Sequence, residues 1–216
     1  MLFFPHDDPT GVRDAKRTFE EGCAKCGIPL MFWREVPVDP HDLGSTAQAC
    51  MPTILQAFLR RPADVDAGQA FERKLYVCRR TIERAADANP ALAGKIFYVC
   101  SMSSRTIVYK GMLVATQMRR FFIDLNDAAV ETSLALVHSR YSTNTTPSWE
   151  RAHPNRYIIH NGEINTLRGN ISWTRAREPK LYSPVLGDDL RQVLPIINRE
   201  GSDSAILDNV LEFLTM

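Results

Sequence analysis

The sequence has no long hydrophobic segment and no strong excess of either charge. No uncharged run approaches the roughly 20 residues that a helix needs to span a bilayer, and residues 1–8 lack the basic start and long apolar core of a secretory signal. The 26 Lys and Arg nearly balance the 25 Asp and Glu, and no basic block is present that could follow a phosphate backbone. These absences argue against a membrane or a nucleic acid as a partner.

Cysteine is scarce and odd in number. The five cysteines are scattered over positions 23, 26, 50, 78 and 100, which is unlike the paired framework of a small secreted protein and typical of a reducing compartment. We therefore expect a cytoplasmic protein. Cys23 and Cys26 have CxxC spacing, but no second CxxC or histidine pair lies nearby, so the sequence favours core thiols over a metal or redox site.

What is present describes one ordinary globular domain. The chain has 216 residues with 44% hydrophobic and 24% charged residues, enough for one substantial core, and it contains no repeat or low-complexity linker. A helix is predicted to begin near Pro9, with Phe19 and Cys23 on its apolar face and Gly27 to stop it. Residues 30–36 alternate as in a short strand between two prolines.

The middle of the chain predicts further scaffold elements. Residues 71–78 favour a strand, because Tyr76 and Val77 suit pleated packing, and residues 79–88 have the composition of a helix. The segments 96–101 and 106–110 flank a polar turn and predict a hairpin.

Two polar segments in the second half are the strongest indication of a site. The apolar run 133–137 is followed by His138–Asn144. The apolar run 157–160 ends at His160, which also begins the second polar segment, His160–Thr166. We interpret both runs as strands that deliver polar side chains to one cleft. A helix is then predicted over residues 163–175.

Arg140 is the candidate carboxylate ligand of the first polar segment. A guanidinium grips a carboxylate through two charge-assisted hydrogen bonds, a geometry that lysine cannot copy. Taken alone, however, such an arginine is more often a solvated side chain or part of an internal ion pair. His138 likewise favours a structural hydrogen-bonding role over that of a general base.

Asn161 and Gly162 follow the second run. In isolation this dipeptide is typical of a tight hairpin turn, but the residues after it have helical rather than strand composition. A glycine between strand and helix also lets a ligand approach the backbone, where an N–H group and an asparagine amide can together stabilise an oxyanion.

A third polar segment, Gly201–Ser204, precedes an apolar helix predicted over residues 205–214. Ser202 or Asp203 there would serve as the N-cap. An acidic side chain at a helix entry can also receive an ammonium group, so Asp203 and Arg140 could together recognise an α-amino acid.

The three segments resemble the class II glutamine amidotransferase domain of glutamate synthases. The resemblance rests on His138–Asn144, His160–Arg168 and Gly201–Asn209, and Thr106–Met112 extends it upstream, so that the whole chain, residues 1–216, is identified as part of one such domain.

The resemblance implies a fold and a reaction. The fold is α+β, a four-layer αββα sandwich of the N-terminal-nucleophile hydrolase type, here expected to be incomplete at both ends. The reaction is hydrolysis of L-glutamine to glutamate and ammonia through a cysteinyl thioester. It also implies roles for four residues: Arg140 binds the α-carboxylate of glutamine, Asp203 binds its α-amino group, and Asn161 with Gly162 stabilises the oxyanion.

The resemblance further implies partners and cofactors outside this segment. In the complete enzyme the ammonia is added to 2-oxoglutarate in a separate domain that uses FMN, an iron–sulfur cluster and a reductant, which is NADPH, NADH or ferredoxin. The remaining synthase domains of the same polypeptide, and a small reductase subunit, are the implied protein partners.

The chain departs from the family pattern at the nucleophile. The family uses a cysteine at the mature N-terminus, whereas this sequence begins with Met1 and Leu2, and its Cys26-Gly27 pair follows a helix-like segment. We therefore expect an internal fragment that lacks the nucleophile and is inactive alone. Two alternatives stay open: a non-catalytic glutamine-binding or interaction module, and a fragment of another class II amidotransferase, such as one that makes phosphoribosylamine or asparagine.

Overall fold

The computed structural model describes residues 1–140, 146–161 and 164–216. Its sheet has four antiparallel strands in the order β2-β3-β1-β4. These strands are β1 (Leu2–Phe4), β2 (Leu30–Glu35), β3 (Thr53–Leu59) and β4 (Tyr98–Val99). The α-helices are α1 (Pro9–Lys25), α2 (Ser45–Ala49), α3 (Gln69–Asp87), α4 (Met118–Phe121), α5 (Leu167–Arg177), α6 (Leu190–Val193) and α7 (Asp203–Thr215). Short 3₁₀ turns lie at 90–92, 115–117, 123–126, 178–180 and 187–189.

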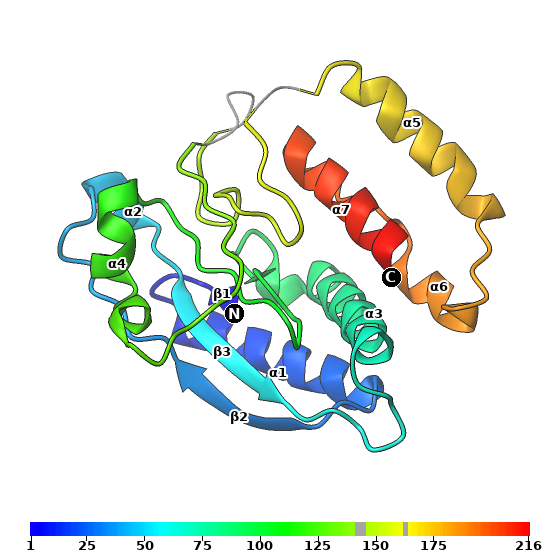
Figure 1. Ribbon diagram of the computed structural model, residues 1–216, viewed down its shortest axis with the longest axis horizontal. Helices are drawn as coiled ribbons and strands as arrows, with labels where there is room; N and C mark the ends of the chain where they lie inside the picture. Colours follow the sequence, from blue (N-terminus) through cyan, green and yellow to red (C-terminus); the bar gives the residue numbers. More distant parts are fainter. Residues whose placement is uncertain (141–145, 162–163) are drawn as a thin grey trace.

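Strand β1 lies inside the sheet and is covered on both faces (Figure 1). Leu2 and Phe4 point to one face, where they join a cluster with residues of α1 and α3. Phe3 points to the other face and packs edge-on against Trp149, with ring centroids 6.0 Å apart. The alternation of side chains along a strand therefore divides the core into two apolar layers.

Helix α1 begins and ends where its sequence predicts. The Asp8 carboxylate accepts a hydrogen bond from the backbone N–H of Gly11 (2.8 Å) and caps the helix, and Pro9 occupies the first turn. After Lys25, Gly27 turns the chain with a φ of +65°. Phe19 and Cys23 lie on the buried face, as expected. Strand β2 likewise confirms the strand predicted over 30–36.

Helix α3 corrects the strand predicted over residues 71–78. Phe71, Leu75, Cys78 and Ile82 are all buried within one helix. Their spacing of three and four residues matches the helical period, and this outweighs the strand propensity of the residues between them. The helix approaches α1 closely, because a Cβ added at Gly22 would lie 2.4 Å from Ile82.

The predicted hairpin over 96–101 and 106–110 is also wrong. Residues 98 and 99 form β4, which pairs with β1 instead, and residues 106–110 are irregular. A partner nearly 100 residues away replaces the local one. Strand β3 was not predicted, because the proline-rich composition of residues 37–62 obscured it.

The two strands predicted before the polar segments do not form in the structure. Residues 133–137 and 157–160 are irregular, and Leu134 and Val137 are 76% and 78% exposed. A strand needs a partner for its backbone groups, and none of the described residues pairs with these runs.

Helix α3 also separates the sheet layer from the C-terminal helices (Figure 1). Tyr76 and Val77 pack against Leu186, Leu190 and Val193 in and before α6. Helices α5 and α7, which overlap the helices predicted over 163–175 and 205–214, pack through a small apolar cluster.

The architecture confirms the α+β class. A second sheet does not occur among the described residues, so the four-layer sandwich stays a prediction. Within that same part of the chain, no helix is both long and apolar enough to cross a membrane.

Candidate functional site

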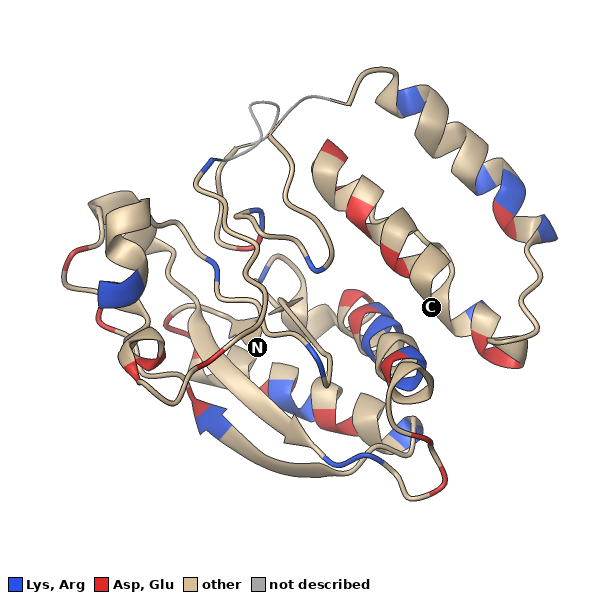
Figure 2. Cartoon of the chain, viewed as in Figure 1, with Lys and Arg blue, Asp and Glu red and all other residues tan. Residues whose placement is uncertain are grey.

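Helix α7 buries polar side chains where an ordinary helix buries apolar ones. It carries acidic residues and no basic ones, and it lies near the arginines of α3 (Figure 2). One of its buried residues is apolar, Ile206; the others are Asp203, Ser204, Asp208, Asn209 and Glu212. Buried polar groups cost free energy unless they are hydrogen-bonded, so the partners of this face define what the helix holds in place.

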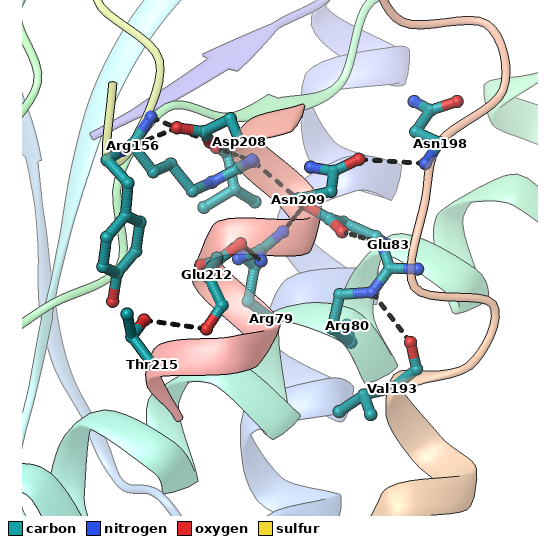
Figure 3. Close-up of polar contacts among 12 residues, drawn as sticks. Arg79, Arg80, Glu83, Arg156, Val193, Asn198, Asp208, Asn209, Glu212 and Thr215 are labelled. Atoms are coloured by element: carbon teal, nitrogen blue, oxygen red, sulfur yellow. Dashed lines mark hydrogen bonds and ion pairs between the residues drawn. The ribbon is translucent and has the colours of Figure 1, made fainter. Parts of the chain in front are cut away.

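The C-terminal part of this face is fixed to α3 by ion pairs (Figure 3). Glu212 pairs with Arg79, and Arg79 also pairs with Glu83 at 2.6 Å. Arg156 reaches Glu83 from the other side at 3.1 Å. Burial would raise the pKa of Glu83, but the charges of Arg79, Arg156 and Arg80 outweigh it and lower the pKa to about 2. The network is therefore ionised at neutral pH and connects α3, α7 and the loop at 156.

Asp208 holds the loop that leads to the second polar segment. Its carboxylate accepts three backbone hydrogen bonds, from Arg156 at 3.2 Å, Tyr157 at 2.8 Å and Ile158 at 2.9 Å. Asp208 is 1% exposed. Since residues 156–158 form no strand, this carboxylate replaces the strand partner that their backbone N–H groups lack.

Asp203 holds the far side of the same segment. Its Oδ2 accepts from the backbone N–H of Ile164 at 2.9 Å, and its Oδ1 accepts from the N–H of Ser204 at 2.6 Å. Burial would raise the pKa of Asp203, but these backbone hydrogen bonds, the Ser204 hydroxyl and the nearby His160 together lower it. Asp203 is therefore a buried carboxylate, and Ser202, whose Oγ accepts from the Ala205 N–H at 3.2 Å, is the N-cap.

Three histidines continue the contacts toward Arg140. The Nδ1 of His160 lies 3.1 Å from the Ser204 hydroxyl, and the backbone N–H of His160 donates to Nδ1 of His153 at 3.3 Å. His153 stacks on His138 with ring centroids 4.5 Å apart. The backbone N–H of Arg140 in turn donates to Nδ1 of His138 at 3.1 Å.

The contacts therefore join the three polar segments that the sequence singled out. Arg140 and Asn161 are exposed residues in irregular segments, each next to a histidine of the chain of contacts. Asp203 is buried at the start of α7. Gly162, the remaining predicted site residue, lies outside the described residues.

Sequence reasoning missed His153, Ser204 and Asp208. Ser204 and Asp208 lie within Gly201–Asn209, which carries the resemblance, but the motif gave them no role in holding the segments together. The spacing of Ser204, Asp208 and Glu212 places them on one helix face, which could have indicated a polar face on α7. His153 lies in the segment Trp149–Pro154, which also resembles glutamate synthases, but that resemblance gives it no role.

The four cysteines other than Cys50 offer no reactive thiol. Cys23, Cys78 and Cys100 are at most 1% exposed. A hydrogen bond to Cys78 and burial raise the pKa of Cys26, a hydrogen bond to Cys23 raises that of Cys78, and burial raises that of Cys100. A thiol with a raised pKa is a poor nucleophile at neutral pH.

Cys50 is the exposed cysteine, and its Sγ lies 3.8 Å from the sulfur of Met112. It follows α2, and its thiol also lies within hydrogen-bond distance of the carbonyls of Thr46 and Ala47. Among the residues that the structure describes, no group of three or more His, Cys, Asp or Glu side chains is arranged to hold a metal.

A cavity of about 250 Å³ lies apart from these segments, between β3 and the start of α3. Its walls include Phe58, Phe71 and Leu75, with Ser103 at the rim. It contains none of the residues of the three polar segments, so it gives no support to a site there.

Comparison with known proteins identifies relatives over the whole chain. The model of the family described as "Glutamine amidotransferases class-II" matches residues 1–216. The chain is 51% identical over 190 residues to the glutamate synthase [NADPH] large chain of Bacillus subtilis, which covers 88% of this chain and 12% of that protein.

Two further relatives agree. The chain is 46% identical over 220 residues to glutamate synthase [NADH] of Schizosaccharomyces pombe, covering 99% of this chain and 10% of that protein. It is 42% identical over 214 residues to ferredoxin-dependent glutamate synthase 1, chloroplastic/mitochondrial, of Arabidopsis thaliana, with 99% and 13% covered. The chain thus spans about a tenth of the length of these relatives.

Proposed function

The chain belongs to the class-II glutamine amidotransferases, and from this membership we propose that it forms the glutamine-binding part of a glutamate synthase. The single observation that carries the proposal is the chain of contacts from Arg140 through three histidines to Asp203. It brings together the three segments whose side chains would recognise an amino acid. The names of the relatives favour a glutamate synthase over an amidotransferase that makes phosphoribosylamine or asparagine.

Each residue of the site would recognise a different part of L-glutamine. The exposed guanidinium of Arg140, which forms no ion pair with another described residue, would bind the α-carboxylate. Asp203 would bind the α-amino group, and the lowered pKa of this carboxyl keeps it charged for that role. Asn161 and Gly162 would donate to the oxyanion that forms when the side-chain amide is attacked.

The attack itself requires a cysteine that we do not find among the five in this chain. Four are buried or have raised pKa values, and the described contacts of the Cys50 thiol are with Thr46, Ala47 and Met112, outside the polar segments. Glutamine hydrolysis through a thioester would therefore use a cysteine outside these 216 residues. Residues 1–216 would contribute binding and oxyanion stabilisation to a larger amidotransferase domain, whose four-layer sandwich would contain a second sheet.

The remaining chemistry of a glutamate synthase belongs to other domains. A flavin, FMN, and an iron–sulfur cluster would carry electrons from NADPH, NADH or ferredoxin to the reaction of ammonia with 2-oxoglutarate. We assign these cofactors, and contacts with a small reductase subunit, to the rest of the polypeptide, as the resemblance to glutamate synthases implies. The cytoplasm is the expected compartment, although the Arabidopsis relative is named for chloroplast and mitochondrion.

A non-catalytic glutamine-binding module is the second candidate, favoured by the absence of a reactive thiol near the site. The two candidates differ in whether the chain works as part of a larger catalytic domain, and they agree that it binds glutamine. Both therefore predict that the chain alone binds glutamine without hydrolysing it. Joining the chain to the amino-terminal segment of a relative would separate them, since only the amidotransferase assignment predicts that activity then appears.

Calorimetric titration of L-glutamine into the purified chain tests the proposal. We expect saturable binding that weakens about tenfold or more in Arg140→Lys, because an ammonium cannot reproduce the bidentate contact. Arg175→Lys, on the exposed face of α5, is the matched control and should bind as the parent does. Absence of binding, or equal binding by both variants, would refute the assignment of Arg140. Glutamate release that is lost in Cys50→Ala would overturn the view that the nucleophile lies elsewhere.

A further inference from the structure

The His138–His153 pair has an unusual hydrogen-bonding state. Each ring accepts a backbone N–H at Nδ1, from Arg140 at 3.1 Å and from His160 at 3.3 Å. A backbone N–H can only donate, so both Nδ1 atoms must be unprotonated. In a neutral imidazole the proton then resides on the other nitrogen. The two backbone contacts therefore set both rings in the Nε2–H tautomer.

Both Nε2 atoms are buried and have no hydrogen-bond partner among the described residues. His153 is 7% exposed, and the two rings stack with an angle of 29° between their planes. A buried N–H donor without an acceptor costs about 1–3 kcal/mol. Among the described residues, neither of these two adjacent donors has an acceptor that would offset this cost.

The tautomer limits what a ligand of this pair can be. A metal ion needs the lone pair of an unprotonated nitrogen, and Nε2 carries its proton as long as Nδ1 accepts from the backbone. The pair can therefore donate to an oxygen but cannot coordinate a cation. A carboxylate or carbonyl oxygen fits this requirement.

The charges around the pair favour an anion. Lys110 is 2% exposed, and its Nζ donates to two uncharged oxygens, the Tyr98 hydroxyl at 3.2 Å and the Glu150 carbonyl at 2.8 Å. Burial lowers the pKa of His153 to about 4, with further lowering by His138, Lys110 and His160 and opposition from Asp203. The ring is thus a neutral donor in an electropositive interior.

We propose that His138 and His153 form a neutral donor pair that binds a carboxylate oxygen of the amino-acid ligand through their Nε2–H groups. This inference rests on the proposed function for the source of the ligand, and it adds two ligand-contacting residues to Arg140, Asn161, Gly162 and Asp203. The buried charge of Lys110 stabilises the same carboxylate without contacting it. The oxygen belongs to either the α- or the γ-carboxylate end, and the choice of ligand distinguishes the two.

Two substitutions of His153 separate its Nε2–H donor from the contact between its Nδ1 and the backbone N–H of His160. In His153→Asn the amide oxygen can replace Nδ1 and keep the His160 N–H satisfied, but no donor reaches the Nε2 position. In His153→Gln the amide nitrogen occupies the Nε2 position and keeps the donor. We expect His153→Asn to weaken L-glutamate binding by roughly tenfold or more, as for loss of a hydrogen bond to a charged group, and His153→Gln to retain most of it.

Three ligands locate the carboxylate. L-glutamate has both carboxylates, L-glutamine lacks the one at the γ position, and 4-aminobutyrate lacks the one at the α position. If the pair binds the α end, His153→Asn weakens L-glutamine as much as L-glutamate and leaves 4-aminobutyrate unaffected. If it binds the γ end, the effect persists with 4-aminobutyrate and is smaller with L-glutamine, whose γ-carbonyl oxygen carries no charge. Equal affinity of the parent, His153→Asn and His153→Gln for all three would refute the pair, while Arg140→Lys still reports on the proposed function.

Imidazole nitrogen NMR of the parent chain tests the pair without any variant. We expect the chemical shifts of both rings to report the neutral Nε2–H tautomer in the free protein. Both Nε2–H signals should move on saturation with L-glutamate, or with acetate as a simple carboxylate probe. An Nδ1–H tautomer, or Nε2–H signals that do not respond to any carboxylate, would overturn the inference even if the assigned function is correct.

Discussion

Two regions of this chain are held together by different forces. The layer formed by the sheet, α1 and α3 is stabilised by apolar burial: Phe4, Phe19 and Ile82 are at most 1% exposed. The region from residue 146 to α7 is organised by directional polar contacts, in which Asp208 alone accepts three backbone hydrogen bonds. The scaffold can thus tolerate changes of polar surface, whereas the site region depends on individual oxygen and nitrogen atoms.

The difference has a functional consequence. Apolar burial is non-directional and roughly proportional to area, so it can fix a layer without fixing the position of a particular atom. Binding an amino acid requires donors and acceptors at defined positions. The region that would bind glutamine is the one in which carboxylates on one helix position the backbone of two irregular segments.

The largest expected effect is on the apolar layer. Phe19→Ala removes a ring that packs 5.1 Å from Trp33, between centroids, within the first cluster, and we expect the free energy of unfolding to fall by about 4 kcal/mol. Urea unfolding measures the change. Phe32→Ala is the control, because Phe32 is 50% exposed, and its loss should cost about 1 kcal/mol or less. Equal costs for the two would contradict the assignment of stability to this cluster.

The polar region should respond to a change of a single atom. Asp208→Asn preserves shape but replaces one acceptor oxygen by a donor that faces backbone N–H groups, and we expect a loss of about 2–3 kcal/mol in the free energy of unfolding. Asp189→Asn, at an exposed position, should change it by less than about 0.5 kcal/mol. If Asp208→Asn changes the free energy of unfolding as little as Asp189→Asn does, the carboxylate does not organise residues 156–158.

The third effect should appear gradually, as a dependence on pH. The pKa of His153 is lowered from 6.5 to about 4 in the folded chain, mainly by burial, so the unfolded state binds a proton first as the pH falls. The stability contributed by the neutral ring is present above pH 6.5 and is lost progressively down to pH 4, by up to about 3 kcal/mol. His153→Gln removes this titration. As the pH is lowered from 6.5 to 4, the free energy of unfolding of the parent should therefore fall relative to that of His153→Gln. Parallel profiles would show that His153 is not buried as a neutral ring.

The sequence predicted helix α1 more reliably than the strands. Pro9–Lys25 carries its own cap, its apolar period and its stop signal, and all of these are local. The strand predicted over 71–78 failed because the helical spacing of its buried residues outweighs local strand propensity. The hairpin predicted with 106–110 failed because pairing depends on distant residues: β4 pairs with β1 across almost the whole first half of the chain. Local composition contains no information about that partner.

For the site, the motifs identified residues but not the contacts that connect them. Asp203 was recognised as an acidic residue at a helix entry, yet its bond to the N–H of Ile164 depends on how a separate segment folds. His153 shows the same limit, since its role arises from stacking on His138 and from the backbone N–H of His160. Directional contacts between irregular segments leave no periodic pattern in a sequence.

The most direct test of the central claim is to map the binding of L-glutamine by backbone amide NMR. We predict that the largest shifts fall on residues 138–140, 153, 160–164 and 203–204, while the amides of β1 and β3 stay unchanged. Shifts confined to the apolar cavity around Phe71, or no shifts at saturating glutamine, would contradict the assignment of the glutamine site to the region organised by α7.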